Sequence, residues 1–157
     1  MNLERQFGLC KMNLERQSGA KHAKKKTWVY SPPKPPKPKV TESVKADLQK
    51  KADNLIETVI KPEHVKEPPK EGDLNYIVDI YSKWYRSYFY FCAKYNCPSP
   101  NAIYPSFETK FARMEYLENG RFNLSYMRHT QQWWEIFTDL PMDECLKQIG
   151  DGAHFMP

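Results

Sequence analysis

Few side chains in this sequence could take part in acid-base chemistry. Histidine titrates near neutral pH, and of the four histidines only His129 falls near predicted regular structure, beside Arg128 in a turn between strands. With Glu115, Glu135 and Arg113 on neighbouring strands, it could form an acid-base or phosphate-binding cluster. The alternative is a turn histidine capped by its neighbours, with Arg113 in a cross-strand ion pair with either glutamate.

The sequence contains no recognised catalytic or phosphate-binding motif. The six glycines form no Gly-rich loop, and neither a nucleophile elbow nor an HExxH pattern is present. The four cysteines, at positions 10, 92, 97 and 145, match no zinc spacing, and inert thiols are the expectation. We therefore expect no metal ion and no cofactor, and a binding protein more than an enzyme.

Basic residues concentrate near the N-terminus. Residues 1–70 carry 16 Lys or Arg against 8 Asp or Glu, whereas residues 71–157 carry 8 against 11. Residues 1–40 are predicted to be a disordered, basic, Pro-rich arm, because proline favours an extended backbone. Such lysines attract phosphates by releasing counterions, although a solvated linker is the alternative. The candidate contacts with nucleic acid or an acidic protein are Lys24, Lys25, Lys26, Lys34, Lys37 and Lys39.

The chain after the arm divides into four predicted segments. Apolar residues at helical spacing predict an amphipathic helix over 41–60, ended by Lys61-Pro62. This helix either packs on the domain or pairs with another chain. Residues 61–72 read as a Pro-rich linker, residues 73–150 as an α+β core domain, and residues 151–157 as a loosely held tail.

An aromatic segment opens the core domain. Its apolar residues share one face of a helix running from residue 73 to about 95, followed by an irregular loop over 96–106. At 1.5 Å per residue this helix would be roughly 33 Å long, enough to cross a sheet. The residues of the predicted buried face are Ile77, Ile80, Tyr81, Trp84, Tyr88, Phe91, Cys92 and Tyr95.

Asn119-Gly120 predicts a hairpin, because both residues tolerate positive φ. A two-residue loop would place Arg113 and Glu115 on the same face as the apolar residues of the next strand. A three-residue loop over 118–120, with Gly120 left-handed in a bulge, instead pairs Tyr116 with Phe122 and leaves every apolar residue on one face. The burial pattern favours the three-residue loop, because a one-residue slip inverts all side chains.

The third predicted strand covers residues 133–137. Alternation places Trp134 and Ile136 on the apolar face, and places Trp133, Glu135 and Phe137 on the polar face with Arg113. A tryptophan there indicates a contact surface, unless a loop or the arm covers it. A short helix follows, starting near Pro141 and ending at Gly150, and its predicted buried stripe is Met142, Cys145, Leu146 and Ile149.

Three segments carry a resemblance to a known class of protein. RMEYLENGRFNLSYMRHT, WWEIF and LPMDECLKQI resemble small bacterial conserved-hypothetical proteins, whose sheets carry an R-x-x-Y, Gly turn, R-H-T, W pattern. These proteins have no assigned activity. The resemblance therefore implies a bacterial-type soluble domain and supplies no catalytic residues.

The expected architecture is an α+β fold, with one long aromatic helix packed on a three-stranded antiparallel meander, a short C-terminal helix and an N-terminal amphipathic helix. The favoured function is a non-enzymatic adaptor whose arm contacts nucleic acid or an acidic protein. The alternative is a regulatory module whose polar sheet face binds a protein through Arg113, Arg128, His129, Trp133 and Glu135. No apolar run is long enough to span a membrane, and a cytoplasmic protein is expected.

Overall fold

A computed structural model describes residues 32–33, 35–69 and 74–157. The contact pattern separates Met1–Lys34 from Pro35–Pro157, and the second unit is the one described below. The predicted arm contacts at Lys24, Lys25, Lys26 and Lys34 lie outside the described residues. Lys37 and Lys39 lie within them.

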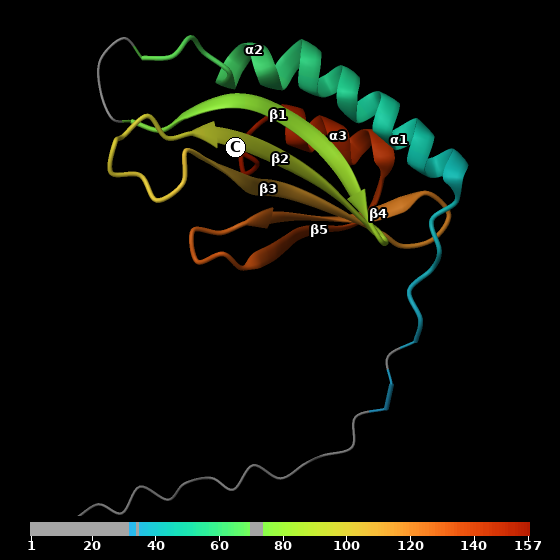
Figure 1. Cartoon of the computed structure of the whole chain (residues 1–157). Helices are drawn as coiled ribbons and strands as arrows, with labels where there is room; N and C mark the ends of the chain where they lie inside the picture. The colour runs from blue at the N-terminus through green and yellow to red at the C-terminus, as the bar shows by residue number, and fades with distance from the viewer. Residues whose placement is uncertain (1–31, 34, 70–73) are drawn as a thin grey trace, which may run out of the picture. The chain divides into compact units, whose positions relative to one another are not determined.

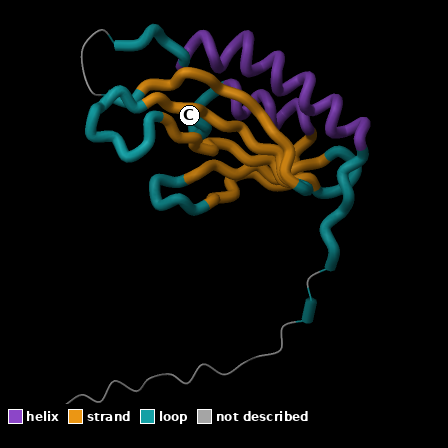
Figure 2. The backbone as a smooth tube through the Cα atoms, viewed as in Figure 1, coloured by secondary structure: helices purple, strands orange, loops and turns teal. Residues whose placement is uncertain are grey.

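In the described part of the chain, five strands form one antiparallel sheet in sequence order, and the helices pack on one face of it (Figures 1 and 2). The α+β class and the two terminal helices are confirmed. The three-stranded meander is a correction, because two further strands precede it. The strands are β1 (Tyr76–Tyr85), β2 (Tyr88–Asn96), β3 (Ser106–Tyr116), β4 (Arg121–Met127) and β5 (Trp133–Pro141). The helices are α1 (Glu42–Leu55), η1 (Ile56–Ile60), α2 (Lys61–His64) and α3 (Met142–Gly150).

The predicted long aromatic helix is wrong: residues 76–96 form the β1–β2 hairpin. Alternate residues of β2, such as Phe89 and Phe91, are fully buried on the helix-covered face, while Tyr88 and Tyr90 point to the other face. When a strand carries apolar residues on both faces, its sequence matches the spacing of a buried helix face as well as the two-residue period of a strand. Tyr, Phe and Ile favour strands, and pairing with β3 decides the outcome.

The N-terminal helix is confirmed, but it continues past Pro62 to His64. A proline ring within a helix clashes with the carbonyl four residues earlier. Here the preceding turn is a wider π-helix, in which the Lys61 N–H bonds to the Ile56 carbonyl five residues back. Pro62 then stands in the first turn of α2, where a missing backbone N–H is tolerated. No helix among the described residues is long and apolar enough to cross a membrane.

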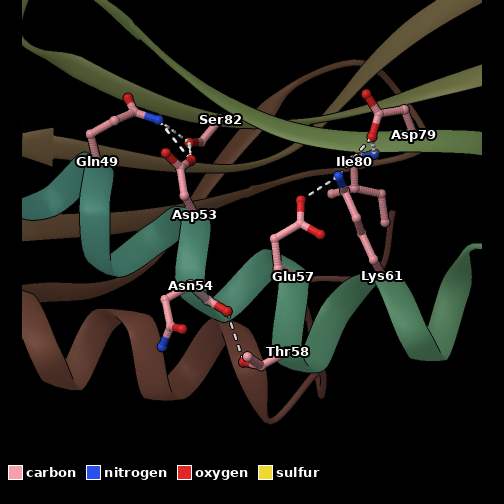
Figure 3. Close-up of polar contacts among 9 residues, drawn as sticks. All are labelled: Gln49, Asp53, Asn54, Glu57, Thr58, Lys61, Asp79, Ile80 and Ser82. Atoms are coloured by element: carbon pink, nitrogen blue, oxygen red, sulfur yellow. Dashed lines mark hydrogen bonds and ion pairs between the residues drawn. The ribbon is translucent and has the colours of Figure 1, made fainter.

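The helix packs on the sheet through a buried stripe and is fastened to strand β1 by polar contacts (Figure 3). Lys61 Nζ lies 2.5 Å from Glu57 Oε1 and 3.0 Å from Asp79 Oδ1 of β1. Ser82 of β1 accepts a hydrogen bond from the Gln49 amide at 2.8 Å. The fully or nearly buried residues of the stripe are Leu48, Ala52, Ile56 and Ile60. The helix is therefore part of the core.

The hairpin register predicted from burial is confirmed. Tyr116 pairs with Phe122, and Arg113 pairs with Ser125 on the polar face. Asn119 and Gly120 both have positive φ, at 52° and 73°. The Arg121 N–H bonds to the Glu118 carbonyl, and the Leu117 N–H bonds to the Arg121 carbonyl. The tight turn therefore consists of Asn119 and Gly120, and the extra residue is Glu118 before the turn, whereas the predicted bulge was at Gly120.

Strand β5 runs to Pro141, four residues beyond the predicted end. The predicted position of Phe137 on the polar face is wrong. A bulge separates the pairs Ser125–Glu135 and Leu124–Phe137, which leaves Ile136 unmatched and turns Phe137 toward the core.

In α3, Cys145, Leu146 and Ile149 are buried, as the predicted stripe requires.

The last residues also contribute to the core. Phe155, within the predicted tail, is only 3% exposed. The ring of the neighbouring His154 lies 6.3 Å from the ring of Tyr126. Gly150 lies against the N-terminal helix, because a Cβ added there would approach Leu55 Cδ1 to 3.0 Å. A larger residue at this position would require the end of the Leu55 side chain to shift by a few tenths of an ångström.

Candidate functional site

The face of the sheet opposite the helices carries a cluster of aromatic and charged side chains, which we call the open face. It is not covered by any helix of the described residues (Figure 1). Strand alternation brings these residues to one side from β2, β3, β4 and β5. The open face consists of Tyr88, Tyr90, Lys110, Arg113, Glu115, Ser125, Trp133 and Glu135.

Arg113 lies at the centre of the open face between two aromatic rings. Its Cζ atom is 4.8 Å from the centre of the Tyr88 ring and 4.7 Å from that of Trp133. Nη2 donates to Ser125 Oγ at 3.5 Å. The Nε atom is buried and has no hydrogen-bond partner among the described residues. Cation–π contacts thus hold the guanidinium where hydrogen bonding is incomplete.

Further rings extend the cluster along β2. The Tyr90 ring lies 5.7 Å from Trp133 and 6.1 Å from Tyr88. Lys110 Nζ stands 5.0 Å from the centre of the Tyr90 ring. Burial raises the pKa of the Tyr90 hydroxyl, with Arg113 acting in the opposite direction. The tyrosine is therefore a neutral stacking and hydrogen-bonding group at physiological pH.

The described end of the predicted arm reaches the open face. Lys37 Nζ lies 4.2 Å from the centre of the Tyr88 ring and donates to Tyr88 OH and Glu115 Oε1. The bond to Glu115 is the largest cause of the raised pKa of Lys37, followed by the bond to Tyr88. Lys37 and Arg113 thus both contact the same tyrosine.

A second polar group lies on the same side of the sheet, nearer the β1 edge. Lys83 Nζ is 2.6 Å from Glu108 Oε1, and the Tyr81 hydroxyl donates to Glu108 Oε2. The hydrogen bond from Lys83 is the largest cause that lowers the pKa of Glu108, and the hydrogen bond from Tyr81 is the next. Burial raises the pKa of the nearby Cys92 thiol to about 11. At neutral pH this cysteine is a protonated thiol and not a nucleophile.

The structure brings together some of the predicted site residues and separates others. Arg113, Trp133 and Glu135 share the open face, as predicted. Arg128 instead lies 5.0 Å from the ring of Trp134, whose strand partner Tyr126 packs against the core. His129 is exposed in the turn between β4 and β5, without a hydrogen bond or ion pair to another described residue.

Sequence reasoning missed Tyr88, Tyr90 and Lys110 as members of the site. The two tyrosines fell within the predicted helix, where Tyr88 was expected to be core. The available signal was their alternation with Phe89 and Phe91, which places tyrosine and phenylalanine on opposite faces of a strand. Lys110 precedes a bulge at Phe111 that moves it out of simple alternation with the rest of β3.

The chemistry that this arrangement supports is recognition. Aromatic rings and a guanidinium plane can stack with planar groups, and the lysines can pair with anions. In the described parts of the chain, no three His, Cys, Asp or Glu residues are grouped so that they could hold a metal ion.

The comparisons with known proteins place the chain in a family. No curated protein and no solved structure matches it. The resemblance to an uncharacterised conserved family is nevertheless confirmed by a family model, which matches residues 37–157 and so includes Lys37 and the whole sheet. The chain belongs to the family described as a domain of unknown function, DUF3024.

Proposed function

We propose that this protein is a non-enzymatic binding protein that takes a single-stranded nucleic acid on its open face. The observation that carries the proposal is the meeting of Lys37 and Arg113 on the Tyr88 ring. Lys37, the one arm lysine with a described contact on the open face, thereby links the two candidates that were separate in the sequence.

Stacking is the first contribution. Unpaired bases stack on aromatic rings and on arginine planes, and each stacked base contributes about 1–3 kcal/mol. Tyr88, Tyr90 and Trp133 are each half-buried, so part of each ring remains accessible. Arg113 fixes two of these rings in place before a ligand arrives, which reduces the entropy lost on binding.

Charge is the second contribution. Lys37, Lys110 and Arg113 lie among the rings, and Lys83 and Lys94 extend the basic residues across β1 and β2. Glu115 and Glu108 are paired with lysines. A backbone phosphate can replace the carboxylate at Lys37, and the predicted contacts at Lys24, Lys25, Lys26 and Lys34 would add to this attraction.

The test measures the binding of fluorescently labelled oligo-dT and oligo-U, each about twenty nucleotides long, by fluorescence anisotropy at several salt concentrations. The double variant Lys37→Ala/Lys110→Ala should weaken binding several-fold and reduce the salt slope by about 1.4, since each phosphate contact contributes about 0.7. The matched control is Lys50→Ala/Lys147→Ala, which removes two exposed lysines from helices α1 and α3.

Two results would contradict the proposal. One is the absence of binding by the unaltered protein at 50 mM salt. The other is an equal loss of affinity in the double variant and the control, since that would mean net charge alone governs binding. Deleting residues 18–34 in the unaltered background measures the contribution of the other arm lysines.

The open face also has a feature that favours a second candidate, a protein partner. Glu135 is exposed beside Trp133 and makes no ion pair with a described residue. It would repel phosphate and attract a lysine or arginine. The regulatory interaction module becomes the better account if two results are found together. The unaltered protein does not bind oligonucleotides, and Trp133→Ala abolishes co-purification of a protein partner.

A further inference from the structure

A cavity of about 730 Å³ adjoins the open face at one end of the molecule. Its walls are the chain from Lys37 to Glu42, the first turns of α1, and the turn between β1 and β2 at Arg86-Ser87. Its volume falls in the range of small-molecule sites, roughly 300–1,000 Å³. The cavity shares Lys37 and Tyr88 with the open face but otherwise has its own residues.

The lining of the cavity is strongly basic. Four cationic side chains, Lys37, Lys39, Lys45 and Arg86, face one carboxylate, Glu42. Glu42 is paired with Lys45 at 2.8 Å, and Lys37 is bonded to Glu115. Lys39 and Arg86 make no hydrogen bond or ion pair with any described residue. Two positive charges therefore remain available for an anion.

The turn that carries Arg86 is held in an unusual conformation. Arg86 has φ of +57°, which non-glycine residues rarely adopt. The Tyr116 N–H bonds to the Ser87 carbonyl at 2.9 Å and ties the turn to β3. Positive φ also occurs at Asn119 and Gln131 in other turns, so at Arg86 it reflects the tight connection between β1 and β2. Arg86 lines the cavity, and its guanidinium carbon lies 5.3 Å from the centre of the exposed Tyr85 ring.

The cavity also has apolar walls, which a site for a bare inorganic ion would not need. Pro38, Val40 and the Tyr88 ring lie beside the cations. A ligand that satisfies both features carries a phosphate and a planar or apolar group. We propose that this cavity binds the phosphate monoester of a nucleotide, with Lys39 and Arg86 contacting the phosphate.

This site does not depend on the proposed function of the open face. The ligand is a free mononucleotide or the 5′-phosphorylated end of a strand, which share the same chemistry. Isothermal titration calorimetry with adenosine and thymidine 5′-monophosphates measures the affinity for free mononucleotides. The corresponding nucleosides and inorganic phosphate serve as comparisons. The difference in affinity between oligo-dT with and without a 5′-phosphate measures recognition of a phosphorylated strand end.

The decisive variant is Lys39→Ala/Arg86→Asn, because asparagine tolerates positive φ and keeps the turn intact. Lost charge-assisted hydrogen bonds should raise the dissociation constant of the phosphorylated ligands about tenfold or more. The Lys50→Ala/Lys147→Ala control should shift it less than twofold, and Lys110→Ala on the open face should leave mononucleotide binding unchanged. A preference for either ligand source supports the site.

Three results would overturn it: nucleosides that bind as tightly as their monophosphates, phosphorylated ligands that do not bind, or a double variant that binds as the control does. Circular dichroism and the urea midpoint verify that each variant is folded. Lys110 lies on the open face and not in the cavity. Loss of internal-strand binding in Lys110→Ala, with mononucleotide binding kept, would separate failure of one proposal from failure of the other.

Discussion

Arg113 on β3 stacks on Trp133 of β5, with 4.7 Å between the guanidinium carbon and the centre of the ring, across the intervening strand β4. The same guanidinium is 4.8 Å from the Tyr88 ring on β2. One side chain thus connects rings from both sides of the sheet centre. This arrangement makes the open face a preorganised surface.

The first prediction concerns that pair. A double-mutant cycle with Arg113→Ala and Trp133→Ala, measured by urea unfolding, should give a coupling free energy of about 1 kcal/mol, because the cation and ring are partly shielded from water. The control cycle is Arg128→Ala with Trp134→Ala. Trp134 is 55% exposed and 5.0 Å from the Arg128 guanidinium carbon, so its coupling should be smaller. Equal coupling in both cycles would contradict the preorganised role of Arg113.

The second prediction tests the β3–β4 turn. Gly120 has φ of +73°, and a Cβ added there would meet no atom within 4 Å. Gly120→Ala should therefore lower the free energy of unfolding by about 1–2 kcal/mol through backbone strain alone. Gly120→Asn should cost less, because asparagine adopts this conformation more readily. If both variants are equally stable in chemical denaturation, the left-handed turn is not the conformation in solution.

The third prediction tests whether the N-terminal helix is integral to the core. Leu48 on α1 is fully buried against the sheet. Leu48→Ala should lower the free energy of unfolding by about 2–5 kcal/mol, through lost burial and a residual cavity. Lys50→Ala on the same helix is exposed and should change it by under about 0.5 kcal/mol. A Leu48→Ala effect as small as the control's would mean that the helix detaches from the sheet.

The fourth prediction concerns thiol chemistry. Burial raises the pKa of Cys92 to about 11 and that of Cys145 to about 12. In a Cys10→Ser/Cys97→Ser background, neither thiol should react rapidly with a disulfide reagent at pH 8, whereas both should react after unfolding. Their contribution to stability should fall as pH rises above 9, because the unfolded thiols ionise first. Fast, stoichiometric labelling of the folded protein would refute this.

The fifth prediction concerns acid sensitivity. Lys83 and Tyr81 lower the pKa of Glu108 below its ordinary value of 4.5. A lowered folded-state pKa stabilises the fold above that value, and the stabilisation is lost as pH falls through the folded-state pKa. Glu108→Gln should therefore cost up to about 1 kcal/mol at pH 7, since the pair is partly exposed. The difference from the unaltered protein should shrink below pH 4.5, and a constant difference would exclude the ionic origin.

Local patterns in the sequence predicted the hairpin, its register and both terminal helices. Asn119-Gly120 marks a tight turn, and only one register keeps Arg113 away from Phe122 and Leu124. Burying an unpaired charge is costly, so the burial pattern selects the register without knowledge of the rest of the fold. The same reasoning placed Trp133 on the face of Arg113, which the structure confirms.

The β1–β2 hairpin required the tertiary structure. Ile80, Trp84 and Tyr88 satisfy a helical spacing, and no glycine or asparagine marks the turn at Arg86-Ser87. The segment becomes a hairpin because β2 finds its second hydrogen-bonding partner in β3, and such long-range pairing leaves little trace in local sequence. Bulges at Phe111 and Ile136 likewise depend on neighbouring strands.

The sequence by itself therefore determined the chemistry that is available: arginine, tyrosine, tryptophan and lysine, with little to support catalysis. Only the tertiary structure decided which of these residues meet. Tyr88 and Tyr90 join Arg113 because strand pairing, not helical periodicity, sets their direction. Lys37 joins them because the chain before α1 passes the β1–β2 turn at one end of the sheet. Local propensity acts over a few residues, whereas the site is assembled by contacts between distant strands.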